Sequence, residues 1–164
     1  MQPDFSALFR VSTIRPLRFE VRNGPNYVHD VQFLSSHLHD ARFTIEDVTL
    51  EDGKLSIVFD RDCWELGYTK HPDSLELHTA SSRLTIEPVS GIDWVFTNED
   101  CRKRELWVEN IHIGEMHWDK NAVSELIVGA PHTGWKLRIA IADDIASIQL
   151  ADLEMPHLHD SNRV

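Results

Sequence analysis

The chain has little of what most catalytic and export signatures require. Its 164 residues include only two cysteines, Cys63 and Cys101, and seven scattered glycines. No glycine group precedes a helix in a phosphate-binding pattern, which argues against nucleotide chemistry. No apolar run is long enough to span a bilayer, and the first residues, MQPDFSALFRV, lack a basic region followed by an apolar one. We therefore expect a cytoplasmic protein with reduced thiols.

Positive charge is also scarce. The chain has 16 Lys and Arg against 27 Asp and Glu, a formal net charge of −11. Nucleic acids require a concentrated basic surface, and the one cationic cluster, residues 102–104, is flanked by the acids Glu99, Asp100 and Glu105. Anionic membranes are disfavoured for the same reason. We expect no nucleic acid and no membrane partner, and instead a protein partner or a homo-oligomer.

No established catalytic signature is present. Neither a Gly-x-Ser-x-Gly elbow nor a Ser-x-x-Lys set occurs. Cys63 lies between Asp62 and Glu65, whose charges raise the pKa of a thiol, so we expect it to be buried and inert. Cys101 precedes the basic cluster, which favours the thiolate, and we expect an incidentally reactive thiol on a loop. Catalytic residues are therefore not assigned.

One long helix is predicted. Residues 23–26 (Asn-Gly-Pro-Asn) break the chain, and Asn26 is a good N-cap. Tyr27, Val31, Leu34 and Leu38 then recur at the spacing of one helical face. The pattern predicts an amphipathic helix over residues 27–38.

From Phe43 onward, the apolar residues alternate with a period of two. Residues 48–50 and 55–59 form a hairpin whose turn, residues 51–54, contains Asp-Gly. Further strands are expected at residues 8–21, 75–79, 83–89, 93–97, 105–117 (with a bulge near Asn110), 135–141 and 148–150. Short turns imply antiparallel pairing. We therefore predict a single mainly β domain over residues 1–164 (α+β at the margin): an antiparallel β-sandwich or partly open barrel with one helix.

The tetrapeptide His-Leu-His-Asp occurs twice, at residues 37–40 and 157–160. Two imidazoles at i and i+2 of an extended segment point to the same side and chelate divalent transition metals. His37, His39, His157 and His159 are therefore candidate metal ligands, with Asp40 and Asp160 as further ligands or as groups that orient the imidazoles. The alternative is that these histidines are surface or helix-capping residues.

Two alternatives accompany the leading interpretation, which is a non-enzymatic interaction or binding module. The first is a metal-binding protein or metal-dependent enzyme that uses both His-Leu-His-Asp stretches. The second is a carbohydrate-binding sandwich in which exposed tryptophan rings, Trp107 and Trp118, stack on sugar. Trp135 shares parity with Leu137 and Ile139, so we expect it in the core.

Overall fold

The fold consists of two antiparallel β-sheets and a helix. The computed structural model describes residues 14–22, 24–66, 68–71, 74–114, 124–141 and 146–158. The helix is α1 (Tyr27–Leu38), and short 3₁₀ turns are η2 (Ile45–Asp47), η3 (Trp64–Leu66) and η4 (Glu99–Lys103). The strands are β1 (Arg18–Arg22), β2 (Arg42–Phe43), β3 (Val48–Glu51), β4 (Lys54–Asp62), β5 (Tyr68–His71), β6 (Ser74–Glu87), β7 (Val89–Phe96), β8 (Leu106–Trp107), β9 (Asn110–Gly114), β10 (Ser124–Ala130), β11 (Trp135–Ile141), β12 (Ser147–Asp152) and β13 (His157–Leu158).

The larger sheet has nine strands and the smaller has four. The larger follows the order β1-β12-β6-β4-β2-β8, with β3 beside β4, and β5 and β13 beside β6. The smaller follows the order β7-β11-β10-β9. Because the strands form two separate antiparallel sheets, the predicted mainly β fold with one helix is confirmed as sandwich-like, and the barrel alternative is not what forms.

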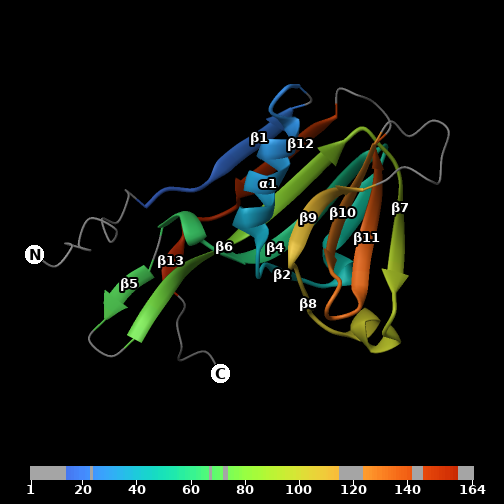
Figure 1. Cartoon of the computed structure of the whole chain (residues 1–164). Coiled ribbons are helices and arrows are strands. Elements are labelled where there is room, and N and C mark those ends of the chain that lie inside the picture. The colour runs from blue at the N-terminus through green and yellow to red at the C-terminus, as the bar shows by residue number, and fades with distance from the viewer. Residues whose placement is uncertain are drawn as a thin grey trace, which may run out of the picture.

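Helix α1 lies against the inner face of the nine-stranded sheet, next to β9 of the smaller sheet (Figure 1). Its bounds match the predicted helix at residues 27–38, and Asn26 occupies the N-cap position, although its side chain makes no capping hydrogen bond. Val31, Leu34 and Leu38 are buried, as the predicted stripe requires. In the described part of the chain, no helix is long and apolar enough to cross a membrane.

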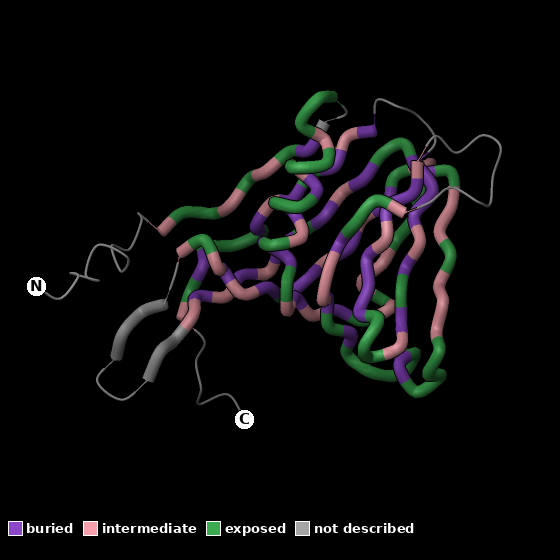
Figure 2. Tube along the Cα trace, viewed as in Figure 1, coloured by how far each residue is buried: buried purple, intermediate pink, exposed green. Residues whose placement is uncertain are grey.

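The core lies between the two sheets and the helix. Buried and exposed residues alternate along strands such as β4 and β11, which Figure 2 shows as a change of colour from residue to residue. Phe43, Phe59, Trp94 and Trp135 form an aromatic group with centroids 5.0 to 6.3 Å apart. Trp135 is buried, as its parity predicted.

The strand predicted over residues 105–117 is in fact two strands in different sheets. β8 pairs with β2 in the larger sheet, whereas β9 pairs with β10 in the smaller one. The alternation of apolar residues changes near Asn110 because the chain crosses there from one sheet to the other, and the predicted bulge is wrong. Val108, at the crossover, is buried and exchanges backbone hydrogen bonds with Ala41 and Asp40.

The segments predicted as strands 75–79 and 83–89 form one continuous strand, β6. Residues 80–82 (Ala-Ser-Ser) contain no turn former, and they pair with β4 throughout. Strand β7 begins at Val89, four residues earlier than predicted. At the N-terminal end, β1 spans residues 18–22 and so includes only residues 18–21 of the predicted segment 8–21, and residues 8–13 of that segment lie outside the described part.

The packing of α1 predicts a clear stability effect. Leu34 is fully buried, so Leu34→Ala removes its contacts and leaves a cavity, which should lower the free energy of unfolding by about 2–5 kcal/mol. Gln32→Ala, on the exposed side of the same helix, should have little effect. Denaturant unfolding measures both, and equal effects would contradict this packing.

Candidate functional site

The first His-Leu-His-Asp stretch lies at the end of α1, and its two histidines have different surroundings. His37, in the last turn, is buried, and its Nδ1 lies 2.8 Å from the carbonyl oxygen of Phe33. His39 follows the helix, is exposed, and its Nδ1 lies 2.9 Å from Oδ2 of Asp40. Asp40 has a positive φ of 64°. His37 therefore belongs to the helix interface and His39 to the surface turn.

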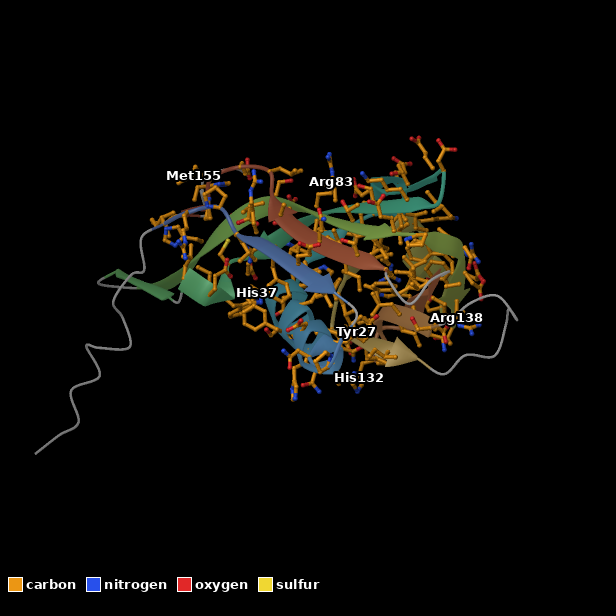
Figure 3. All side chains as sticks on the ribbon, turned by 90° about the horizontal axis from the view of Figure 1, so that it is seen from above. Tyr27, His37, Arg83, His132, Arg138 and Met155 are labelled. Carbon is orange, nitrogen blue, oxygen red and sulfur yellow. The ribbon has the colours of Figure 1, made fainter. Side chains whose placement is uncertain are left out.

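The second stretch begins on the opposite side of the nine-stranded sheet. His157 pairs with Thr79 of β6, whose neighbour His78 is buried on the inner face. Because opposite residues of antiparallel strands share a face, His157 lies on the outer face. His37 lies on the inner face with α1 (Figure 3). The structure does not bring His37 and His157 together, and His159 and Asp160 lie outside the described residues, so a metal site at the second stretch stays a prediction.

A fully buried arginine connects several elements on the inner face. Arg61 of β4 is 0% exposed. Its Nε and one terminal nitrogen donate to the two oxygens of Asp152, over 2.9 and 3.0 Å. Its terminal nitrogens also donate to both oxygens of Glu65, over 2.9 and 2.6 Å. One guanidinium thus holds two carboxylates, with the fork geometry that favours arginine over lysine.

Burial and the two carboxylates determine the protonation states in this cluster. Burial lowers the pKa of Arg61, but hydrogen bonds to Glu65 and Asp152 outweigh this effect and raise the pKa above its ordinary value. Burial raises the pKa of the Cys63 thiol to about 12, Arg61 offsets part of this, and the charge of Glu65 adds to it. Cys63 is therefore a protonated, buried thiol, as the sequence predicted. Cys101 is also buried, and its Sγ lies 3.3 Å from the carbonyl oxygen of Thr133.

The donor atoms of Cys63, Glu65 and Asp152 lie within 4.8 Å of one another, and no other group of three or more His, Cys, Asp and Glu donors in the described residues lies as close. Asp152, however, has no free acceptor site. Besides Arg61, its Oδ1 accepts from the hydroxyl of Ser82 and its Oδ2 from the backbone N–H of Leu17. Each oxygen therefore accepts two hydrogen bonds, its full capacity. A metal would have to displace these donors, so the cluster is better explained as structural.

A pocket of about 540 Å³ lies next to this cluster, and we call it the helix pocket. Its lining residues come from α1, from η3, and from the start of β1 with the segment that leads into it. Its lining residues are Arg15, Pro16, Leu17, Arg18, Phe33, His37, Glu65 and Leu66. Apolar walls with a few polar groups are typical of small-molecule sites.

His37 presents a free nitrogen in the helix pocket. A carbonyl oxygen only accepts, so Nδ1 carries the proton that is donated to Phe33, and Nε2 of the neutral ring carries a lone pair. Nε2 has no hydrogen-bond partner among the described residues. The ring packs against Phe33, with centroids 4.2 Å apart, and is nearly parallel to the more distant Phe19, whose centroid lies at 6.3 Å. The acceptor is therefore held in a fixed direction.

Charges of both signs line the helix pocket. Glu65 is fixed by Arg61, and its side chain remains 23% exposed. Arg15 and Arg18 are exposed at the mouth, and neither has an ion-pair partner among the described residues. Arg15, Arg18 and Arg61 together carry one more charge than Glu65 and Asp152 neutralise, so the site has a net positive charge.

A second pocket of about 410 Å³ lies on the smaller sheet. Its lining includes Val95, Asn110, His112, Ile127 and Lys136. His112 is exposed, and its Nδ1 lies 3.0 Å from Oδ1 of Asn110. In the described residues that line it, no ionisable side chain is buried. The helix pocket is therefore the stronger candidate.

Two buried nitrogens in the described residues have no hydrogen-bond partner, Nδ1 of His78 and Nε1 of Trp135. His78 lies beside Cys63, whose N–H donates to the His78 carbonyl over 2.7 Å. An unpaired buried polar group costs about 1–3 kcal/mol. Neither nitrogen belongs to a residue that lines the helix pocket, so neither contributes to the candidate site.

Trp107 is 46% exposed on β8, which meets the requirement of the carbohydrate alternative for an exposed ring at this position. The Arg42 guanidinium lies 5.4 Å from the centroid of its ring, which places a cation over the aromatic face. Trp118 lies outside the described residues. A sugar site that uses both tryptophans stays a prediction. A protein partner that pairs with a free strand edge also stays a prediction.

Sequence reasoning missed most of the site. Arg61 continues the inward parity of Leu55, Ile57 and Phe59, and Asp152 continues that of Ile148 and Leu150. Two opposite charges at inward positions indicate a buried ion pair, and this signal was available. Arg15, Phe33 and Glu65 carry no such signal, because they meet only in the folded chain.

The buried cluster predicts that replacing Arg61, on the inner face of the nine-stranded sheet, destabilises the protein far more than replacing Arg83, on the outer face. Arg61→Met leaves buried Asp152 without its counter-ion and should lower the free energy of unfolding by about 3–5 kcal/mol. Combining it with Asp152→Leu should recover part of that loss. Arg83→Met, at an exposed position of β6, is the control. Equal stabilities of the two arginine variants in urea unfolding would contradict the buried network.

The raised pKa of Cys63 predicts a loss of stability at high pH. The unfolded thiol titrates near 9.0 and the folded one near 12. The folded state thus keeps the thiol proton to a higher pH than the unfolded state does. The contribution of Cys63 to the free energy of unfolding is therefore full below pH 9 and decreases as the pH rises towards 12. The stability difference between the wild-type protein and Cys63→Ala should shrink over this range in thermal melts, with Cys101→Ala as the control. A difference independent of pH would refute this assignment.

Comparison with known proteins adds no template for this site. No protein family model, no curated protein sequence and no solved structure matches the chain. The chemistry of the helix pocket is therefore what bears on function: a fixed acceptor on His37, a fixed carboxylate on Glu65, and two unpaired arginines.

Proposed function

We propose that this protein is a non-enzymatic binding module that holds a small amphipathic molecule in the helix pocket. The observation that carries the proposal is the imidazole of His37, whose Nδ1 is bonded to the carbonyl oxygen of Phe33 while Nε2 has no hydrogen-bond partner among the described residues. The ring is mostly buried but Nε2 stays accessible, so a ligand N–H or O–H in the pocket can donate to it in place of water.

Preorganisation supports binding at this position. The His37 ring is held by the contact of its Nδ1 with the Phe33 carbonyl and packs against the Phe33 ring, and Glu65 is held by two hydrogen bonds from Arg61. A ligand that enters this pocket would find its polar partners already ordered, which reduces the entropy lost on binding. Leu17 and Leu66 supply apolar walls for the rest of the molecule.

The same residues favour binding over turnover. Glu65, the carboxylate of the pocket, has both oxygens bonded to Arg61. Cys63, the neighbouring thiol, is protonated and buried. None of the described lining residues is a serine, threonine or cysteine, so the pocket wall offers no nucleophile of these types. The acceptor on His37 and the remaining acceptor sites of Glu65 are sufficient for recognition.

The proposal predicts that small fragments bind next to His37. A fragment set of aromatic and aliphatic amphipaths, screened by ligand-observed NMR, should yield binders that shift the imidazole resonances of His37. Leu66→Trp should fill the pocket and weaken these binders about tenfold or more. Leu50→Trp, on the partly exposed hairpin strand β3, is the matched control and should leave affinity unchanged.

Thermal melts first establish that both tryptophan variants fold. Binders that leave the His37 resonances unchanged, or that bind Leu66→Trp as well as they bind Leu50→Trp, would sink the proposal. A screen without any binder to the wild-type protein would do the same.

A further inference from the structure

We infer that the ligand of the helix pocket is an amphipathic monocarboxylate, with its apolar body inside and its carboxylate at the mouth. This inference rests on the proposed binding function and adds the chemical class of the ligand. It follows from the distribution of charge around the pocket and from the position of α1.

The charge at the mouth favours an anion. Arg15 and Arg18 line the pocket and have no ion-pair partner among the described residues, and the single charge of Arg61 is shared between Asp152 and the one lining carboxylate, Glu65. These three arginines and two carboxylates leave one excess positive charge, in a chain whose net charge is −11. Two guanidinium groups are suited to bind a carboxylate through paired hydrogen bonds.

The side of the pocket formed by α1, where Phe33 is 48% exposed and His37 is buried, favours an uncharged group. Phe33 and His37 belong to the last two turns of α1, where the helix dipole gives a partial negative charge. An anion is disfavoured there, while an apolar or hydrogen-donating group fits Phe33 and the free Nε2 of His37. The ligand therefore has its charge at one end and its apolar body at the other.

The same dipole argues for one negative charge rather than two. Among the described residues that line the pocket, Arg15 and Arg18 are the only exposed arginines, and the α1 residues, Phe33 and His37, come from its C-terminal half. A dianionic phosphate would increase repulsion from the helix end without any further cation to compensate it. A carboxylate matches the available charge.

Three probes with one apolar body test the class of ligand: 3-phenylpropionate, 3-phenylpropan-1-ol and 3-phenylpropylamine. In NMR titrations that follow the His37 imidazole, the carboxylate should bind on the order of fivefold more tightly than the alcohol, and the amine most weakly. Raising the salt concentration should reduce this preference, because the arginines are exposed.

The double variant Arg15→Gln, Arg18→Gln should lower the affinity for the carboxylate to that for the alcohol and leave the alcohol unchanged. Arg83→Gln, on the outer face of the nine-stranded sheet, is the matched control and should preserve the preference.

The outcomes separate this inference from the proposed function. If the alcohol or the amine binds at His37 as tightly as the carboxylate, or if the double variant keeps the preference, the carboxylate inference is overturned while binding in the pocket stands. If none of the three probes shifts the His37 resonances, the inference fails regardless, and the fragment screen decides the binding function separately.

Discussion

The buried ion pair between Arg61 and Asp152 is the interaction on which the arrangement of this protein depends. It joins β4 to β12 across β6, and through Asp152 it also receives the N–H of Leu17 at the entry to β1. Arg61 further fixes Glu65 on η3. A guanidinium removed from water is tolerated only when its donors are satisfied, and here most of them are. This one side chain therefore holds η3 directly, and through Asp152 it holds the segment that leads into β1, which are two of the sides of the helix pocket.

The fold was largely predictable because its signals are local. The spacing of Val31, Leu34 and Leu38 predicted the helix, and Asp52-Gly53 predicted the hairpin turn, where both residues have positive φ. Where prediction failed, the information was not local. Parity alone cannot distinguish a bulge within one strand from a crossover between sheets, so the change near Asn110 was misinterpreted.

The candidate site was less predictable than the fold. His37 was identified from the sequence, but as a metal ligand or surface histidine rather than as a buried acceptor in a pocket. Its role depends on Phe19 and Glu65, which come from separate segments and meet only through tertiary packing. The inward parity of Arg61 and Asp152 is the exception, because alternation alone placed two opposite charges in the core.

The position of α1 has a mechanical consequence. In the layer that covers the nine-stranded sheet, the four strands β7, β11, β10 and β9 are locked together by backbone hydrogen bonds in a fixed register. The helix occupies the neighbouring place in that layer, and it is attached to β9 through side chains, such as the Ser35 hydroxyl that accepts from the N–H of Ile111. A small shift of α1 along β9 breaks no backbone hydrogen bond between strands. The boundary between α1 and β9 is therefore the part of this layer that can change shape most easily.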